Sequence, residues 1–282
     1  MTRVDALSIK AASHEINQDY ALFGYTPFPH AVICDGCSSS PYTDVGARIV
    51  AHAAQSIINT RRLVSSMYLS AEHREQAGLD IIWRAAHISD LLSLPRTALD
   101  TTLLFLADIG DSIVCFVWGD GYVINVARGQ DQTSIDFSDT SLAYFRLSNE
   151  GSAPCYLSYQ LSSARYDAYR KEEHTFRVHY GSLEEDEIEI TSNLAKDGSY
   201  SAIFCKQSYC TLAIASDGLA AFSPKGNIAE TAKEIVSYKT SKGRFVARRL
   251  LRMEENLRKE CHISFDDLSV AGMQITEEEK DA

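Results

Sequence analysis

Apolar residues in the first third of the chain recur at spacings that predict short strands followed by two consecutive helices. The predicted strands are residues 3–10, 19–24 and 30–34. Over residues 44–63 apolar side chains return every three or four positions, after a candidate N-cap at Thr43. A second such stretch covers residues 71–94, where Pro95 prevents further helical turns. Two helices in succession favour one helical layer packed on the strands.

The rest of the chain repeats this order of strands and then helices. The predicted strands are residues 101–107, 112–118, 121–127, 211–216 and 268–275, and the predicted helices are residues 228–238 and 243–259. Turns of Gly and Asp join the first three of these strands, as in antiparallel hairpins. Residues 130–205 are rich in Ser and Tyr and show no clear period. The pattern predicts a single α+β domain over residues 1–282, with a divergent loop region at about 130–205.

Composition narrows the classes of partner. The 282 residues include 27 Lys and Arg against 38 Asp and Glu, a formal charge of −11. A nucleic acid or an anionic membrane attracts a positive field, so we expect neither as a partner. No apolar run approaches the length that spans a bilayer, and a cytoplasmic protein is expected. Seven cysteines are an odd number spread along the chain, which favours reduced thiols, and the lone Cys34/Cys37 pair lacks the partners of a structural zinc site.

Five aspartates stand at the ends of predicted strands, each beside a turn. They are Asp19, Asp35, Asp120, Asp217 and Asp266. Carboxylates gathered at one rim of a sheet repel one another unless cations lie between them, and a set of oxygen ligands without His or Cys selects hard ions such as Mg²⁺ or Mn²⁺. Asp-Gly is also common turn chemistry, so each aspartate alone is more typical of a turn than of a ligand. As a set, they are candidates for a metal centre.

In their order along the chain, these acids and their neighbours resemble the motifs of the PP2C (PPM) metal-dependent serine/threonine protein phosphatases, in the bacterial form. The stretches that carry the resemblance are Asn17-Gln18-Asp19, Asp35-Gly36-Cys37 before Thr43-Asp44-Val45-Gly46, Thr101-Thr102-Leu103, Gly119-Asp120-Gly121, Ser216-Asp217-Gly218 and Asp266-Asp267-Leu268-Ser269-Val270. Each motif is short, but six of them follow the family's order over nearly the whole chain.

The resemblance implies a four-layer α-β-β-α sandwich of two mainly antiparallel sheets flanked by paired helices. It also implies two Mn²⁺ or Mg²⁺ ions at one end of the sheets, with room for a weaker third. The implied ligands are Asp19, Asp35, Gly36, Asp120, Asp217 and Asp266, with Asp35 bridging both ions as a catalytic residue. The implied reaction is hydrolysis of phosphoserine or phosphothreonine in the protein substrate of a Ser/Thr kinase, through water activated by the metal pair.

The chain departs from the family at the position that commonly holds a phosphate-binding arginine. His14 stands there, five residues before Asp19, and we assign it to phosphate binding beside the alternative of a solvated loop residue. Residues 38–40 replace a stretch that often ends in a histidine acid, which leaves His14 and His30 as candidate substitutes. A catalytically weak or inactive pseudophosphatase that serves as a protein-binding module is therefore an alternative, and a hydrolase of another phosphoester is a third.

Two further placements depend on the order of the hairpins. Gly110-Asp111-Ser112 spells the family's Gly-Asp-Ser better than the stretch around Asp120 does, but it falls at the earlier hairpin turn, so we assign Asp111 to the turn. Residues 140–180 interleave arginines with tyrosines in an acidic chain. We interpret them as a substrate-facing flap in which Arg165, Arg170 and Arg177 meet a phosphopeptide, against the alternative of an ordinary edge-strand region.

Overall fold

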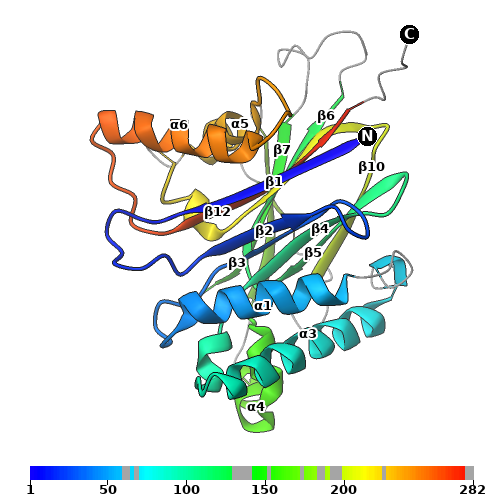
Figure 1. The fold of residues 1–282 in the computed structure, drawn as a ribbon, viewed down its shortest axis with the longest axis vertical. Coiled ribbons are helices and arrows are strands. Elements are labelled where there is room, and N and C mark those ends of the chain that lie inside the picture. The colour runs from blue at the N-terminus through cyan, green and yellow to red at the C-terminus, as the bar shows by residue number, and fades with distance from the viewer. Residues whose placement is uncertain are drawn as a thin grey trace.

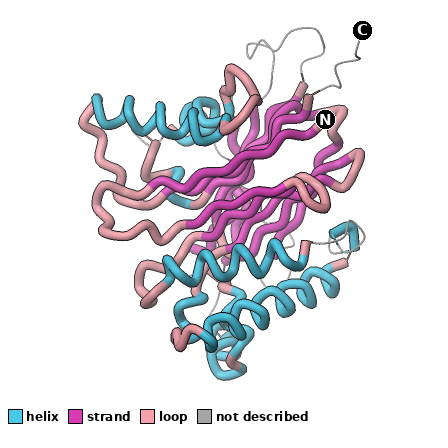
Figure 2. The backbone as a smooth tube through the Cα atoms, in the orientation of Figure 1, coloured by secondary structure: helices cyan, strands magenta, loops and turns pink. Residues whose placement is uncertain are grey.

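The computed structural model describes residues 1–58, 64–66, 70–128, 142–150, 154–171, 175–182, 188–190, 199–223 and 227–276. Two sheets lie face to face at the centre, with one helical layer on the outside of each (Figures 1 and 2). This arrangement is the predicted α-β-β-α sandwich of two antiparallel sheets, and the predicted fold class is confirmed. No helix among the described residues is long and apolar enough to cross a membrane.

The five-stranded sheet has the strand order β10-β5-β4-β3-β2, and its paired strands are antiparallel. Its strands are β2 (Tyr20–Gly24), β3 (His30–Cys34), β4 (Leu103–Asp108), β5 (Ser112–Trp118) and β10 (Ser199–Cys205). Helices α1 (Thr43–Ile57) and α3 (Ala71–Leu91) cover its outer face, next to the short turn η1 (Arg96–Leu99).

The seven-stranded sheet has the order β1-β12-β11-β6-β7-β8-β9, and it is also antiparallel. Its strands are β1 (Thr2–Ile9), β6 (Gly121–Ala127), β7 (Leu142–Glu150), β8 (Thr175–Ser182), β9 (Ile188–Ile190), β11 (Tyr209–Ala215) and β12 (Leu268–Ile275). Helices α5 (Ile228–Val236) and α6 (Phe245–Lys259) cover its outer face, and η3 (Asp217–Leu219) follows β11.

Alternation along the strands divides the buried side chains into three cores. In β4 and β5 the aromatic rings of Phe105, Phe116 and Trp118 face the α1/α3 layer, and the centroids of the two Phe rings are 4.7 Å apart. The intervening Leu104 and Val117 face the other sheet. This is the period of two that a strand imposes on its two faces. The core between the sheets therefore fixes how they pack, and with them the ends of their strands.

Some predicted boundaries were wrong. Helix α1 begins at Thr43 itself, after Tyr42 in a left-handed conformation with φ 62°, and no side chain caps it. The Thr43 hydroxyl instead donates to the carbonyl of Cys37, since that residue lies inside the turn. Residues 59–63, where this helix was expected to continue, lie outside the described residues. The strand expected at 101–107 begins at Leu103, because Thr101 forms an isolated bridge with Gly36.

The region at about 130–205 is only partly described. It contributes β7, β8, β9 and β10 together with η2 (Leu157–Leu161) and α4 (Ser163–Lys171). Exposed loops and edge strands were expected here, and the described residues contain four strands and a helix. The identity of the region as a substrate flap stays a prediction. Cys34 and Cys115 carry free thiols and are buried among apolar side chains, as expected.

Candidate functional site

The register of the five-stranded sheet brings three of the predicted aspartates to one edge. Tyr20 pairs with Cys34, so Asp19 and Asp35 flank the same end of the β2/β3 pair. The start of β4 lies beside this end, and the end of β5 lies beside the start of β4. Asp120, in the turn that follows β5, therefore stands at that edge as well.

The seven-stranded sheet contributes the remaining two aspartates at the matching end. Ala215 pairs with Val270, which places Asp217 just beyond the end of β11 and Asp266 just before the start of β12. Ala215 also pairs with Tyr122 near the start of β6, so the turn that holds Asp120 connects the two sheets at this point. We call this end, with its five aspartates, the carboxylate edge.

Two other residues weighed from the sequence lie at the opposite end. Asp111 is in the β4/β5 hairpin, where Asp108 pairs with Ile113, as the placement in the earlier turn predicted. His30 begins β3 at that same far end, and it is buried with its Nδ1 2.8 Å from the carbonyl oxygen of Phe28. Burial lowers the pKa of His30. The suggestion that His30 could substitute for the missing acid was wrong, because the strand separates it from the carboxylate edge.

Hydrogen bonds from neighbouring loops fix the position of Asp19. The hydroxyl of Ser216 donates to Asp19 Oδ2 at 2.7 Å, so a residue of the seven-stranded sheet orients a carboxylate of the other sheet. The backbone N–H of Asp19 donates to Asn17 Oδ1 at 3.0 Å, and Asn17 Nδ2 in turn donates to Ser8 Oγ at 2.7 Å. Asn17 therefore acts as a local turn residue that presents the aspartate.

Burial and mutual repulsion disfavour ionisation of the acids at this edge. Burial, with the nearby charges of Asp217 and Asp267, raises the pKa of Asp19 to about 7. Burial and the charges of Asp19 and Asp217 raise the pKa of Asp35 well above its ordinary value. Burial and Asp217 raise the pKa of Asp266 to about 6. The acids thus lie close enough to oppose one another's charge, which is the condition that a cation relieves.

The donor set suits a hard divalent cation. One carboxylate oxygen of Asp217 is buried with no hydrogen-bond partner, which leaves an acceptor in need of a donor or an ion. Among the described residues, no three His, Cys, Asp or Glu side chains are arranged to hold an ion as they stand, although Asp19, Asp35 and Asp217 each affect one another's charge. Oxygen donors alone, with an orphaned buried carboxylate oxygen among them, fit Mg²⁺ or Mn²⁺.

Two glycines let the backbone approach closely at this edge. A Cβ atom on Gly218 would lie 1.8 Å from the carbonyl oxygen of Asp267, and one on Gly36 would lie 2.8 Å from that of Gln18. A side chain at position 218 would push the segment of Asp217 away from Asp267, and one at position 36 would push the segment of Asp35 away from Gln18. The glycines after these two aspartates are therefore required by packing.

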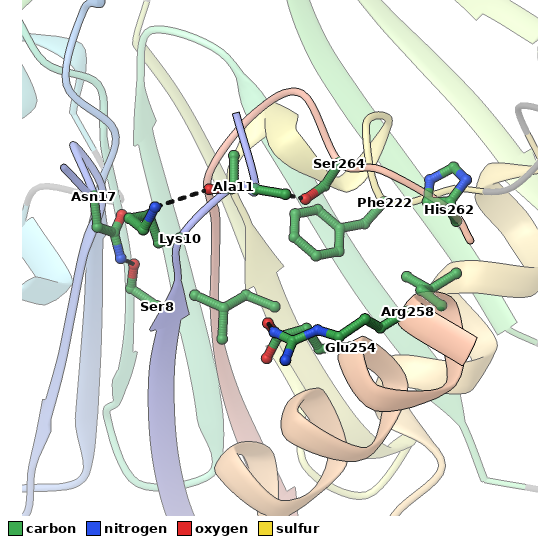
Figure 3. A pocket seen from close by; sticks show the side chains of 12 residues that line it. Ser8, Lys10, Ala11, Asn17, Phe222, Glu254, Arg258, His262 and Ser264 are labelled. Atoms are coloured by element: carbon green, nitrogen blue, oxygen red, sulfur yellow. Dashed lines mark hydrogen bonds and ion pairs between the residues drawn. The ribbon is translucent and has the colours of Figure 1, made fainter. Parts of the chain in front are cut away.

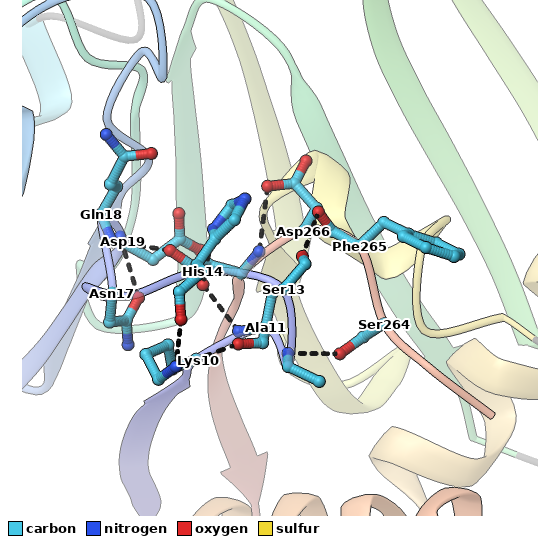
Figure 4. A network of polar contacts seen from close by, with 12 residues as sticks. Lys10, Ala11, Ser13, His14, Asn17, Gln18, Asp19, Ser264, Phe265 and Asp266 are labelled. Carbon is cyan, nitrogen blue, oxygen red and sulfur yellow. Dashed lines mark hydrogen bonds and ion pairs between the residues drawn. The ribbon is translucent and has the colours of Figure 1, made fainter. Parts of the chain in front are cut away.

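A buried carboxylate, Asp267, holds the loop that leads to Asp19. It accepts hydrogen bonds from the backbone N–H groups of Ala11 at 2.7 Å and Gln18 at 2.6 Å. His14 Nδ1 lies 3.1 Å from Asp267 Oδ1, with the imidazole partly exposed, although the two are not aligned as a hydrogen bond. Figure 4 shows this loop beside Asp19 and Asp266. His14 is thus beside the carboxylate edge, at the position expected from the sequence, and it contacts an aspartate.

The other side of this loop borders a pocket of about 460 Å³ (Figure 3). Asn17 and Lys10 line it from the loop, and Arg258 and Glu254 line it from α6. The polar groups here satisfy one another, since Arg258 donates to Glu254 at 2.6 Å and Lys10 Nζ donates to the carbonyls of Ala11 and His14. None of the five aspartates of the carboxylate edge lines this pocket.

Comparison with known sequences supplies the family. A sequence model described as "Protein phosphatase 2C" matches residues 10–260, which include every motif from Asn17 to Gly218. The chain belongs to the protein phosphatase 2C family. The predicted enzyme class, a serine/threonine protein phosphatase, is the class of this family. No curated protein sequence matches the chain.

Solved structures agree on the fold. The chain is similar to PppA, described as a key regulatory component of T6SS in Pseudomonas aeruginosa, with a TM-score of 0.55, 13% identity and 98% of each chain covered. The serine/threonine phosphatase Stp1 from Staphylococcus aureus has a TM-score of 0.56 and 12% identity, over 98% of this chain and 96% of that one. The Mycobacterium tuberculosis serine/threonine phosphatase PstP/Ppp has a TM-score of 0.53 and 12% identity, over 98% and 99%.

Sequence reasoning missed one buried carboxylate outside the carboxylate edge of this PP2C-family chain, that of Asp100. Asp100, just before Thr101-Thr102, accepts hydrogen bonds from Ser40 Oγ at 2.9 Å and Ser158 Oγ at 2.5 Å. Two guanidinium nitrogens of Arg165 donate to the same carboxylate, at 3.2 and 3.0 Å. The signal was an acidic residue directly before a buried strand, where an unpaired charge is costly. Asp100 joins the loop after Gly36 to η2 and α4, and we call this set of contacts the Asp100 clamp.

The clamp changes the interpretation of the predicted flap arginines. Arg165 is bound by Asp100, and its guanidinium carbon lies 4.7 Å from the centroid of the Tyr159 ring, so in this structure it is not free to bind a phosphopeptide. Arg170 lies over the ring of Tyr166 at 5.4 Å. The side chain of Arg177 lies outside what the structure describes. A substrate role for this segment remains a prediction that rests on residues other than Arg165.

Proposed function

We propose that this chain hydrolyses phosphoserine or phosphothreonine esters in proteins, with two Mn²⁺ or Mg²⁺ ions at the carboxylate edge. The observation that carries the proposal is the convergence of five aspartates from both sheets in a member of a phosphatase family, where one oxygen of Asp217 is orphaned and the pKa values of Asp19, Asp35 and Asp266 are raised. The ligands would be Asp19, Asp35, Asp217 and Asp266 with the carbonyl of Gly36, and Asp120 would serve a weaker third ion. Bound there, the ions would neutralise phosphoryl charge and activate water.

The residues of the chain have separate tasks in this proposal. Ser216 keeps Asp19 turned toward the edge, and Asp267 holds the loop of His14 and Gln18 in place. His14 offers a single donor for a phosphoryl oxygen where a guanidinium would offer two. Substrate affinity therefore depends more on the edge itself than in a member that carries arginine at this position.

Hydrolysis of para-nitrophenyl phosphate and of a phosphothreonine peptide, each with Mn²⁺, Mg²⁺ or EDTA, tests the proposal. Activity that Mn²⁺ supports and EDTA abolishes is expected, and the ratio of peptide to small-substrate rates measures the preference for phosphoproteins. Mn²⁺ binding by calorimetry without turnover would instead select the pseudophosphatase alternative, which the absence of an arginine at His14 favours. Turnover of the small ester alone would select a phosphoesterase of another substrate class.

Two ligand variants locate the metals. Asp35→Asn and Asp217→Asn each remove a charged ligand that the hydrophobic cores do not need, so both are expected to fold and to lose Mn²⁺ affinity and activity by about a hundredfold or more. Asp111→Asn is the matched control, because it removes an aspartate from a turn at the far end of the same sheet. Unchanged Mn²⁺ affinity in both ligand variants would refute the metal assignment.

A further inference from the structure

Positive charge is concentrated in one segment of this acidic chain. Residues 239–252 include six of the 27 Lys and Arg and none of the 38 Asp and Glu. The segment forms the loop after α5 and the first two turns of α6, in the outer layer of the seven-stranded sheet (Figure 1). Its basic residues are Lys239, Lys242, Arg244, Arg248, Arg249 and Arg252. A local cationic surface therefore stands on a molecule whose overall charge is −11.

Carboxylates neutralise only two of these six charges. Arg244 pairs with buried Asp5 at 2.5 Å, and Arg249 pairs with Glu234 at 3.7 Å. No described carboxylate forms an ion pair with the other four. Arg248 donates instead to the carbonyl oxygens of Thr240 at 3.3 Å and Lys242 at 2.8 Å, which ties the loop to the helix. The loop is thus held in place while its charges stay available.

The available charges surround a concave surface. A pocket of about 330 Å³ is lined by Lys239 from the loop and by Arg248 and Arg252 from successive turns of α6, with Phe245 among its apolar lining. Lys239, Arg248 and Arg252 are all exposed to solvent. The pocket lies along the first half of α6, whereas Asp266 of the carboxylate edge comes after the C-terminal end of this helix. This basic pocket is not part of the proposed catalytic site.

We propose that the basic pocket docks a short acidic segment of a partner protein. Acidic residues border the cationic surface, with Glu234 on one side and Glu254 and Glu255 in the next turn of α6. A nucleic acid or a flat anionic membrane would extend over these acids and the negative remainder of the chain, within the screening length of about 8–10 Å. A few Asp or Glu side chains in an extended peptide fit within the pocket and avoid that repulsion. The inference does not depend on catalysis at the carboxylate edge.

The test is fluorescence anisotropy of the full chain with a short labelled peptide of Asp, Glu and Ser, against its Asn, Gln and Ser counterpart. The acidic peptide is expected to bind at low ionic strength and to be released by salt, and the neutral peptide is expected not to bind. The double variant Lys239→Glu with Arg252→Glu should weaken binding about tenfold or more, because it reverses two of the four available charges.

The matched control is Arg258→Glu with Lys259→Glu, which changes the net charge equally on the same helix. Both residues already pair with Glu254 and Glu255, so this variant should alter peptide affinity less than about twofold. Equal weakening in both double variants, or no binding of the acidic peptide to the unaltered chain, would overturn the proposal. Tighter binding of single-stranded DNA or of phosphatidylserine vesicles through Lys239 and Arg252 would also overturn it, since the partner would then belong to another class.

Discussion

Replacing Asp100 by Asn tests whether the Asp100 clamp stabilises the chain. The substitution keeps the shape of the side chain but removes its charge and turns one acceptor oxygen into an NH₂ group that faces the donors of Arg165. Of the four hydrogen bonds to the carboxylate, two come from the guanidinium and two from the hydroxyls of Ser40 and Ser158. The substitution therefore weakens the charge-assisted hydrogen bonds from Arg165 and leaves buried donors unsatisfied.

The expected loss can be estimated from the geometry. Removing one member of a fully buried ion pair costs about 3–5 kcal/mol, but Arg165 is 35% exposed and remains partly hydrated after the change. A loss of about 2 kcal/mol in the free energy of unfolding follows, which corresponds to a fall in Tm of roughly 4–8 °C for a chain of this size. Arg165→Ala should cost a similar amount, because it strands the buried carboxylate of Asp100 and uncovers Tyr159.

Urea denaturation of the two single variants and the double variant measures the pair directly. The loss of unfolding free energy in the double variant should be smaller than the sum of the two single losses, by about 1 kcal/mol or more, because the pair can be broken only once. Asp90→Asn is the control: Asp90 and Arg96 form a pair at 2.6 Å that is largely exposed, and its loss should cost less than about 1 kcal/mol. Additive effects of the Asp100 and Arg165 changes, or equal losses at Asp100 and Asp90, would refute the reasoning.

Three further outcomes follow from the carboxylate edge. Asp120→Asn should lower activity at limiting Mn²⁺ more than at saturating Mn²⁺, as expected for the weaker ion, and an identical loss at both concentrations would contradict that role. His14→Arg should lower KM for a phosphothreonine peptide about threefold to tenfold through a second bond to phosphate, and superimposed kinetics of the unaltered, Arg and Ala forms would make His14 a bystander. Without metal, Tm should fall by several degrees as pH rises from about 4 to 8, because the raised pKa values of Asp19 and Asp266 make the folded state bind more protons than the unfolded one. Added Mn²⁺ should reverse this dependence of Tm on pH. A metal-free Tm that rises over this range would contradict the repulsion between the acids.

The strands and the order of the acids were accessible from the sequence because both depend on local pattern. The last strand was predicted at its observed bounds, Leu268–Ile275, since a mainly apolar stretch there directly follows Asp266-Asp267. Counting the turns was enough to separate Asp120 from Asp111, because successive turns alternate between the two ends of the sandwich. The hairpin predicted at Gly119-Asp120 was wrong, however, because β5 and β6 belong to different sheets. Register then converts such positions into neighbours in space, and it brings aspartates as distant in sequence as Asp19 and Asp266 to one edge of the sandwich.

Contacts between distant segments were not accessible in the same way. The grip of Arg165 on Asp100 needs α4, which the sequence left among loops, to pack beside the loop after Gly36. The pattern showed Arg165 only as a basic residue among tyrosines, and an exposed and a paired arginine have the same local sequence. The expectation that His30 lies near the site was wrong for a related reason. His30 is close to Asp35 along the chain, but the extended strand β3 lies between them.

The carboxylate edge also ties cation supply to the assembly of the fold. Asp19 and Asp35 belong to one sheet, Asp217 and Asp266 to the other, and the hydroxyl of Ser216 bridges between them. A chain whose two sheets have not yet packed together holds only half of the set, so a divalent ion would bind the finished sandwich in preference to any partly assembled form. An ion bound at this edge would therefore stabilise the assembled sandwich over partly assembled forms, and Mn²⁺ should raise the free energy of unfolding as well as support activity.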